Sequence, residues 1–302
     1  MIVKIKDVDL AWLAGVLEGD GYFGVTKGCF MHPIISLRMI DKDTVERVAD
    51  IFNEPLVGCS ARLGKPHWSP VHAVSTQGKA AMAIMEKILP FMGERRGCKI
   101  SSITSNYNLK LKQINQQKIQ IPLTKSSRKF SLKVSVKSSQ ELIDLYYLAG
   151  LLEAEGSFMK GSPSSPNCPK VVIQMTDEDI IKKVSNMFGF KYYSYQRKGL
   201  CKAPPYKKVF IFSIKSASAA ALMKKVYPIM SVRRQKQIDS ALLSYDADLR
   251  KNMVNHKTKI FKKDFETIKK MRANGMSLRA IAEKFNVDHK TVRLTIRDRI
   301  NK

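Results

Sequence analysis

Cysteine and long apolar runs are both scarce in this chain of 302 residues. No apolar stretch approaches the roughly 20 residues of a membrane-spanning helix, and the first ten residues, MIVKIKDVDL, lack the apolar core of a secretion signal. The cysteines are odd in number and form no CxxC pair, which argues against structural zinc and a disulfide framework; they are Cys29, Cys59, Cys98, Cys168 and Cys201. We therefore expect a protein of a reducing intracellular compartment, either a bacterial or phage-infected cytoplasm or an organelle matrix, with no membrane partner.

Acidic residues are also few. The chain has 26 Asp and Glu against 53 Lys and Arg, which gives a formal net charge of +27. Such an excess either repels itself or meets a polyanion, so nucleic acid is the predicted partner. A generally basic, ribosome-like protein is the alternative. The stretch 95–140 contains no acid at all, which predicts a strongly positive segment in the middle of the chain.

What the sequence does have is an internal repeat, at an offset of 135 or 136 residues. LAGVLEGDG (13–21) returns as LAGLLEAEG (148–156), and ISLRMIDKDTVERVADIF (35–52) is matched by VVIQMTDEDIIKKVSNMF (171–188). Each longer segment reads as an alternating strand, an acidic residue and an amphipathic helix. Two strand candidates and a helix follow in each half, at 57–63, 70–76 and 78–92, then at 191–198, 207–215 and 216–230.

This order predicts an α+β protein with two similar halves, each with a mostly antiparallel sheet. The segment 115–139 is rich in Lys, Ser and Gln and is expected to be a linker. We predict four parts: a first repeat, a basic linker, a second repeat and a C-terminal tail, at 1–114, 115–139, 140–250 and 251–302.

The tail carries fifteen Lys and Arg against five acids and ends in the pattern of two short helices. Ser277 and Asp288 are candidate N-caps of these helices, with a turn between them at Asn286, where a glycine is often found. The pattern predicts a helix-turn-helix that clamps DNA. The side chains expected to face DNA are His289, Lys290, Arg293 and Arg297. A generic surface helix pair is the alternative.

Small residues recur along both repeated motifs. Gly15 and Gly19 in the first, and Gly150 and Ala154 in the second, are spaced by four, so each set forms a flat stripe that lets another helix approach closely. If the two stripes pack together, Asp20 and Glu155 meet at the helix ends. Two carboxylates so placed repel unless a hard divalent cation shares them. Glu18 and Glu153 lie on another helix face, where they either make structural hydrogen bonds or face solvent.

The two motifs resemble the signature of the LAGLIDADG homing endonucleases, in a single-chain form with two repeats. The resemblance covers residues 8–245 and implies two αββαββα halves whose signature helices form the interface and whose sheets make a saddle over double-stranded DNA. It implies site-specific cleavage of both strands with short 3′ overhangs. It also implies that Asp20 and Glu155 bind Mg²⁺, for which Mn²⁺ or Ca²⁺ could substitute in binding, with the Gly19 and Ala154 carbonyls as further ligands. Glu155 departs from the common Asp.

The resemblance further implies a basic residue near each scissile phosphate and a polar residue that organises active-site water. The matching basic positions hold Arg95 and Arg233, with Arg96, Lys99, Arg234 and Lys236 close by. Arg can stabilise phosphorane-like charge but carries protons less readily than Lys; a solvated basic helix start is the alternative. The polar positions hold Asp41 and Asp177, which instead could simply cap the helices that follow.

Strand alternation predicts which side chains face DNA, because every second residue points to the same sheet face. Counting from Asp20 places Tyr22 and Thr26 on that face, with Arg38 on the next strand and Gln174 on the matching strand of the second repeat. The hairpin 191–210 is dense in Lys, Arg, Tyr and Gln; its predicted DNA contacts are Tyr193, Tyr195, Arg197 and Lys207, or their alternates, since a one-residue slip inverts the set.

The predicted function is a monomeric, magnesium-dependent, site-specific double-strand DNA endonuclease with no obligate protein partner. Two other classes fit the same scaffold. An intron RNA-splicing maturase would use it to bind RNA, and both activities could coexist. A DNA-binding regulator would keep the fold with inactive sites, although the presence of both carboxylates argues against this.

Overall fold

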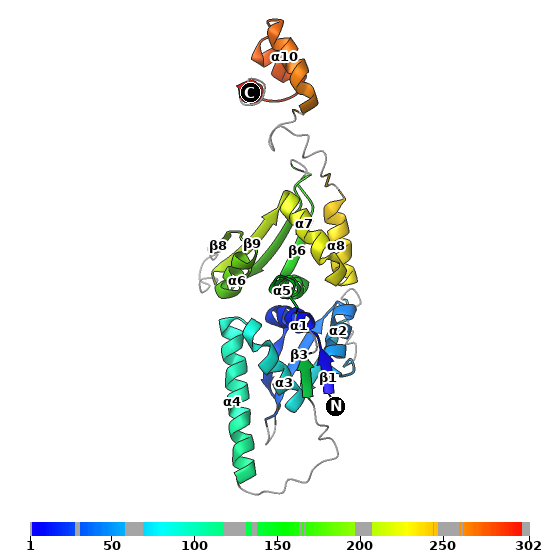
Figure 1. Ribbon diagram of the computed structural model, residues 1–302, viewed down its shortest axis with the longest axis vertical. Coiled ribbons are helices and arrows are strands. Elements are labelled where there is room, and N and C mark those ends of the chain that lie inside the picture. The colour runs from blue at the N-terminus through cyan, green and yellow to red at the C-terminus, as the bar shows by residue number, and fades with distance from the viewer. Residues whose placement is uncertain are drawn as a thin grey trace. The chain divides into compact units, whose positions relative to one another are not determined.

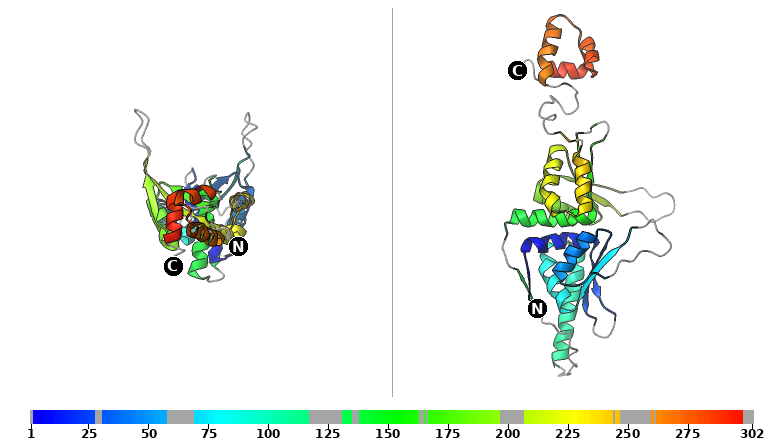
Figure 2. Two further views of the ribbon diagram at one scale, coloured as in Figure 1. Left: turned by 90° about the horizontal axis from the view of Figure 1, so that it is seen from above. Right: turned by 90° about the vertical axis from the view of Figure 1, so that its right-hand side faces the viewer.

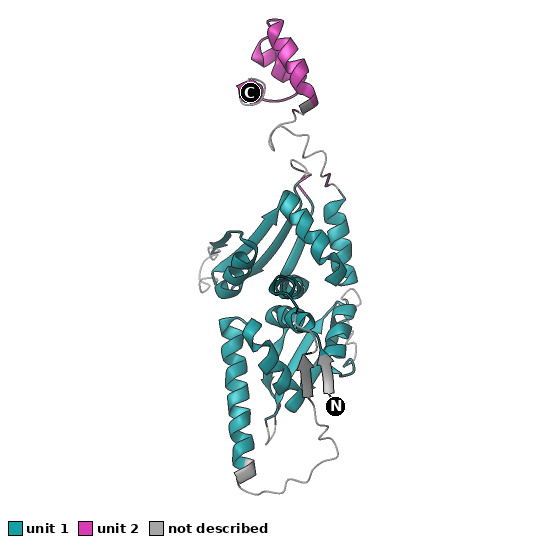
Figure 3. Cartoon of the chain, viewed as in Figure 1, with its two compact units in different colours: residues 1–160, 168–243 teal, residues 161–167, 244–302 magenta. Residues whose placement is uncertain are grey.

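The computed structural model describes residues 2–27, 31–57, 69–116, 131–134, 138–162, 165, 167–196, 207–243, 245–246, 260 and 262–297. It divides into two compact units (Figure 3). The first comprises 1–160 and 168–243 and contains both repeats; the second comprises 161–167 and 244–302. Within the described residues, no helix is both long and apolar enough to cross a membrane.

The first repeat alternates helices with strands of one sheet (Figure 1). Its elements are β1 (Ile2–Ile5), α1 (Asp7–Asp20), β2 (Tyr22–Val25), β3 (Pro33–Met39), α2 (Lys42–Phe52), β4 (His72–Gln77), α3 (Lys79–Ile88), the 3-10 turn η1 (Leu89–Phe91) and α4 (Glu94–Gln116). Strands β2, β3 and β4 form an antiparallel sheet in that order.

The second repeat follows the same order from its signature helix onward, with two strands between its second and third helices where the described part of the first repeat has one. Its elements are α5 (Gln140–Glu155), β6 (Gly156–Met159), β7 (Lys170–Met175), α6 (Glu178–Phe188), β8 (Tyr192–Tyr195), β9 (Val209–Lys215), α7 (Ser216–Val226), the 3-10 turn η2 (Tyr227–Ile229) and α8 (Val232–Leu242). Its antiparallel sheet has the order β6-β7-β9-β8. The predicted α+β fold with two matching halves is confirmed.

Helices α1 and α5 pack directly against each other at the centre of this unit. They are seen end-on in Figure 1 and side by side along their length in the right-hand view of Figure 2. Helix α1 is buried along most of its length, including Trp12, Leu13 and Leu17, whereas α5 is buried over its C-terminal half, from Tyr147 to Glu153. A single hydrophobic core runs through both repeats, so the two halves share the interior that stabilises them.

Glycine is required where these two helices meet. A Cβ added to Gly15 would overlap the Tyr147 carbonyl oxygen and lie 2.6 Å from the Leu151 amide nitrogen, and one added to Gly150 would overlap the Trp12 carbonyl oxygen and lie 2.9 Å from the Val16 amide nitrogen. The backbones therefore touch, as the small-residue stripes predict. Contacts advance in the same sense along both helices, so the helices run parallel.

The strand expected at 57–63 falls almost entirely outside the described residues. Two other features differ from the sequence expectations. The helices expected at 78–92 and 216–230 each end early, at Ile88 and Val226, and pass into a 3-10 turn that contains Pro90 or Pro228, because proline has no amide to continue the helical hydrogen bonds. Within the predicted linker, Ser131–Val134 forms strand β5, which pairs with β1 in parallel; alternation in the sequence does not reveal this pair.

The second unit contains the turn η3 (Lys262–Asp264) and the helices α10 (Phe265–Ala273), α11 (Leu278–Lys284) and α12 (His289–Thr295). Ile268, Ile281 and Val292, one from each helix, meet in a small core of their own. The predicted caps are present: the Ser277 hydroxyl accepts a hydrogen bond from the Ala280 amide at 3.1 Å, and the Asp288 carboxylate accepts one from the Lys290 amide at 2.7 Å. The C-terminal part is thus a small all-helical domain.

Asn286 forms the turn between α11 and α12 with a φ of 50°. This is the left-handed conformation that glycine usually supplies, and asparagine tolerates it better than most residues do. The absence of glycine at this position is therefore compatible with the turn.

Candidate active site and DNA-facing surface

The parallel packing of α1 and α5 brings the acidic ends of the two motifs together. A Cβ added to Gly19 would lie 3.0 Å from Cγ of Glu155, so the end of α1 touches the side chain that ends α5. Both helices stop at their acid because Gly21 and Gly156 adopt extended backbone. Asp20 and Glu155 thus lie at one place in the fold, where the strands β2 and β6 begin.

The electrostatics of the pair are those of two crowded carboxylates. Desolvation by burial raises the pKa of Asp20, opposed by the nearby charges of Arg96 and Arg234. Desolvation likewise raises the pKa of Glu155, and the negative charge of Asp20 raises it further. The ionised pair is therefore destabilised, which is the condition that a shared cation relieves.

The donors available at this pair fit a hard divalent cation, because carboxylate oxygens are the ligands that Mg²⁺ and Ca²⁺ prefer. In the part of the chain that the structure describes, no group of three or more His, Cys, Asp and Glu side chains is placed to hold a metal. Backbone carbonyls, water or substrate oxygens would have to complete the coordination. The Gly19 carbonyl, one predicted ligand, accepts a hydrogen bond from Nη2 of Arg96 at 2.6 Å, which leaves it a second lone pair.

Glu18 and Glu153 are fully buried. Glu18 accepts a hydrogen bond from the Gly93 amide at 2.8 Å, and Glu153 accepts one from the Ser231 hydroxyl at 2.8 Å as well as one from the Ser231 amide. Each anchors the turn before the next long helix to its own signature helix. Of the two interpretations, structural hydrogen bonds are what the structure shows.

Two pairs of adjacent arginines, Arg95–Arg96 and Arg233–Arg234, stand near the acids, and the two members of each pair make different contacts. Arg96 donates to the carbonyls of Gly19 and Gly21, and Arg234 donates to the Glu153 carbonyl at 2.7 Å and to the Gly156 carbonyl at 2.7 Å. These carbonyls lie where the signature helices end, and a cationic donor satisfies carbonyls at a helix C-terminus well. Arg96 and Arg234 therefore hold the helix ends that carry the acids, a role that sequence reasoning left open.

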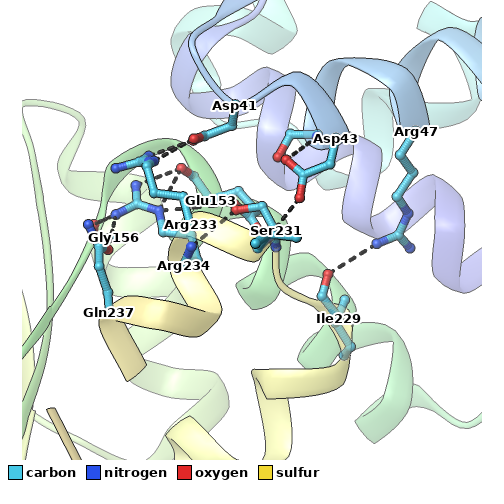
Figure 4. Close-up of polar contacts among 12 residues, drawn as sticks. Asp41, Asp43, Arg47, Glu153, Gly156, Ile229, Ser231, Arg233, Arg234 and Gln237 are labelled. Atoms are coloured by element: carbon cyan, nitrogen blue, oxygen red, sulfur yellow. Dashed lines mark hydrogen bonds and ion pairs between the residues drawn. The ribbon is translucent and has the colours of Figure 1, made fainter. Parts of the chain in front are cut away.

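Arg95 and Arg233 instead form ion pairs with the predicted polar residues. Nη2 of Arg95 lies 2.8 Å from Oδ2 of Asp177, and Nε of Arg233 lies 2.5 Å from Oδ1 of Asp41 (Figure 4 shows the second pair). Asp41 and Asp177 directly precede α2 and α6 but make no side-chain capping hydrogen bond there, so the interpretation as simple caps is wrong. A pocket of about 280 Å³ brings Arg95 and Asp177 to the same wall as Glu155.

No protein-family model matches the sequence, and no curated protein matches it. The chain is similar to solved LAGLIDADG nucleases. LAGLIDADG meganuclease I-AabMI bound to uncleaved DNA is 18% identical with a TM-score of 0.48, over 89% of this chain and 99% of that one. LAGLIDADG meganuclease I-CpaMI bound to uncleaved DNA is 12% identical with a TM-score of 0.49, over 87% and 98%. LAGLIDADG homing endonuclease I-GzeII in complex with its DNA target is 12% identical with a TM-score of 0.48, over 84% and 98%. At such identities, residue roles rest on this chain's own geometry.

On the first sheet, the face away from the core presents polar side chains. Tyr22 is 58% exposed, and Arg38 on the neighbouring strand is also exposed. Tyr22 pairs in register with Ser36, and Arg38 lies two residues further on the same face. Thr26 follows β2, and its hydroxyl accepts a hydrogen bond from the His32 amide at 3.0 Å. Alternation along β4 adds Ser75 and Gln77 to this face, which the sequence prediction missed.

On the second sheet, the structure resolves the register of the hairpin. Tyr193 and Tyr195 share the open face with Gln174: Tyr193 is 54% exposed, and Nε2 of Gln174 donates to the Tyr195 hydroxyl at 3.1 Å. The alternate residue Tyr192 turns to the helix layer, where its hydroxyl donates to Glu178. Lys207 is exposed just before β9, whereas Arg197 lies outside the described residues.

In the helical domain, α12 begins at His289 and carries the predicted side chains on its exposed side. His289, Lys290 and Arg293 are exposed, while Val292 and Thr295 face the small core. Arg297 follows the helix and is exposed too. Three of the four predicted side chains thus lie on the exposed side of α12 and the fourth directly follows it, an arrangement that would suit a recognition helix. Their contact with DNA stays a prediction.

Proposed function

We propose that this chain is a single-chain LAGLIDADG homing endonuclease that makes a site-specific double-strand break with short 3′ overhangs. The observation that carries the proposal is the meeting of Asp20 and Glu155 at the ends of two parallel helices whose backbones touch. A fold needs no such meeting of acids for its stability, since burial, and then the neighbouring charge of Asp20, raise the pKa of Glu155 and so oppose the ionised pair. The solved structures to which the chain is similar include nucleases bound to DNA, in line with this function.

Asp20 and Glu155 would hold the divalent cation, which we propose to be Mg²⁺, with the Gly19 and Ala154 carbonyls or substrate oxygens completing its coordination. When bound, such a cation supplies an activated water and neutralises the charge on the phosphate and the leaving oxygen. Arg95 and Arg233 would add fixed positive charge beside the scissile phosphates. Ion pairing to Asp177 and Asp41 raises the pKa of both arginines, so they would stabilise charge and not carry protons.

Substrate selection would fall to the open sheet faces and the helical domain. Tyr22, Arg38, Gln174 and Tyr193 offer donors, acceptors and aromatic surface for base edges and phosphates. The basic side of α12 would bind a neighbouring stretch of the same duplex as a clamp. A monomer suffices for this function, because one chain supplies both acids and both sheets.

A library of candidate double-stranded sites tests this proposal, with the full-length protein incubated in Mg²⁺ and, separately, in Ca²⁺. We expect double-strand cleavage of one sequence class in Mg²⁺ and tight binding without cleavage in Ca²⁺. Sequence-selective binding with cleavage in neither cation would contradict the enzyme and favour a DNA-binding regulator. Selective binding of a structured intron RNA, alone or beside DNA cleavage, would support the maturase alternative.

A further inference from the structure

The segments that carry Arg95 and Arg233 are each fastened to the opposite repeat. At the start of α4, the Glu94 amide donates to Oδ2 of Asp179 on α6 at 2.6 Å. At the start of α8, the Val232 amide donates to Oδ2 of Asp43 on α2 at 2.7 Å. Each long helix thus has its first turn capped by an aspartate from the other half of the protein, two residues beyond Asp177 or Asp41.

A third contact on each side completes the same pattern. Nζ of Lys183 on α6 donates to the Phe91 carbonyl in η1 at 2.7 Å, and Nη1 of Arg47 on α2 donates to the Ile229 carbonyl in η2 at 3.3 Å. Helix α6 therefore holds the η1–α4 corner of the first repeat. Helix α2 holds the η2–α8 corner of the second, as Figure 4 shows. Because the arrangement occurs twice, with matching residues, it is a built feature of the fold and not an isolated surface contact.

The ion pairs fix how each arginine is presented. Asp177 accepts from Nε of Arg95 at 3.0 Å and from Nη2 at 2.8 Å, and Asp41 accepts from Nε and Nη2 of Arg233 at 2.5 Å each. A carboxylate on this edge of the guanidinium sets its plane and leaves Nη1 outside the pair. The side chains of Asp177 and Asp41 are only 15% and 3% exposed, so both are held firmly.

Each of these arginines also lies on the side of the signature-helix acid, Glu155 or Asp20, that belongs to the opposite repeat. Arg95 and Asp177 line the same pocket as Glu155, although Arg95 belongs to the first repeat and the other two belong to the second. On the other side, the charge of Asp41 acts on Asp20, and Asp41 is paired with Arg233 of the second repeat. Glu155 and Asp177 of the second repeat are thus grouped with Arg95 of the first. Asp20 and Asp41 of the first repeat are grouped with Arg233 of the second.

We propose that Asp177 and Asp41 are positioning residues, each of which orients the arginine of the opposite repeat toward one scissile phosphate. Asp177 serves the site of Glu155 and Arg95, and Asp41 serves the site of Asp20 and Arg233. This inference rests on the proposed endonuclease function. It predicts that loss of either aspartate slows the cleavage of one strand and not of the other.

The test follows the cleavage of each strand separately. The full-length protein is given its selected duplex target with the two strands labelled differently, in Mg²⁺, and the variants are Asp177→Asn and Asp41→Asn. Asn keeps the shape of Asp but removes the charge and places an amide against the guanidinium. We expect Asp177→Asn to slow one strand by roughly 10- to 100-fold, as for a misplaced catalytic group, and Asp41→Asn to slow the other strand by a similar factor.

Asp50→Asn is the matched control, because Asp50 is an exposed residue near the C-terminal end of α2, two turns beyond Asp43; it should leave both strands unchanged. Equal slowing of both strands by each variant would show a merely structural role and overturn the inference. Faster cleavage would overturn it too, since it would mean that the carboxylates compete with phosphate for the arginines. No effect would have the same consequence. If Asp41→Asn does not fold, the more exposed Asp177 pair decides alone. Failure of the unaltered protein to cut any target would instead contradict the endonuclease function itself.

Discussion

Gly15 and Gly150 lie face to face across the interface of α1 and α5: a Cβ added to Gly15 would come within 3.0 Å of the carbonyl carbon of Gly150. Neither position has room for a side chain without moving a backbone. This contact sets the distance between the two helices and hence the distance between Asp20 and Glu155 beyond it. Stability and catalytic geometry are therefore joined at the same two residues.

Replacement of Gly150 by Ala is expected to destabilise the protein. The added methyl would overlap the Trp12 carbonyl oxygen, so the helices must separate, and overpacking of this kind costs about 1–3 kcal/mol or more. Gly97→Ala is the control, since a Cβ there meets nothing closer than Cδ1 of Leu89 at 3.8 Å and alanine favours helix by up to about 1 kcal/mol. Denaturant unfolding measures both. Equal stability of the two variants would mean that the helices do not touch as described.

Glu18 gives the folded chain a pH dependence of known sign. Burial is the main cause that raises its pKa from 4.5 to about 7, against the Gly93 hydrogen bond and the Arg96 charge. The folded protein then holds this proton more tightly than the unfolded chain does, so the group favours folding while it is protonated. That stabilisation disappears as the pH rises from 4.5 through 7, by about 3 kcal/mol in total.

Glu18→Gln should therefore flatten the fall in the free energy of unfolding between pH 5 and pH 7.5. Denaturant titrations at a series of pH values, compared between the variant and the unaltered protein, measure this directly. Glu86→Gln, at an exposed position of α3, is the control and should leave the slope as it is. A Glu18→Gln profile parallel to that of the unaltered protein would show that Glu18 is ionised in the fold at all these pH values.

The helical domain is expected to bind DNA phosphates, so truncation after Arg250 should weaken DNA binding and flatten its salt dependence. The truncation retains all of the first compact unit, which ends at Leu243, and also the contact in which Nδ2 of Asn167 donates to the Asp246 carbonyl at 2.7 Å. Log affinity falls as log salt rises, and the steepness of this fall decreases by about 1 for each phosphate that the shortened protein no longer neutralises. Binding measured at several salt concentrations checks this, and equal slopes would contradict the clamp.

Two single variants test whether α12 is the part of the helical domain that binds DNA. Arg293→Ala removes a charge from the exposed side of α12, and Lys269→Ala removes one from the exposed side of α10. We expect the first to reduce affinity and salt slope and the second to leave both nearly unchanged. If the two variants behave alike, the domain contributes only general positive charge.

Sequence periodicity was sufficient to predict most of the repeated core. The segments 35–52 and 171–188 form β3–α2 and β7–α6, because a strand with every second side chain buried and a helix with one apolar face leave clear patterns. The small-residue stripes predicted the touching helices, since only glycine and alanine permit that approach. The meeting of Asp20 and Glu155 then followed from the packing.

The rest depends on contacts between distant segments, which local patterns do not contain. Arg95 and Arg96 are neighbours in sequence, yet one pairs with Asp177 and the other holds the end of α1; adjacent helix positions face different directions, and only the packing of the opposite repeat distinguishes them. The same holds for Asp43 and Asp179, whose capping partners lie 189 and 85 residues away in sequence. The parallel pairing of β1 with β5 is equally non-local.

Cleavage by the Asp20→Asn variant decides whether the paired acids form the active site. The variant removes one charge from the acid pair at the exposed end of α1, where Asn fits the same space, so folding and the DNA-facing sheets should be unaffected. With the selected duplex target we expect no double-strand cleavage in Mg²⁺ and unchanged affinity for the same duplex in Ca²⁺. Double-strand cleavage at the rate of the unaltered protein would remove Asp20 from the active site and refute the proposed metal site.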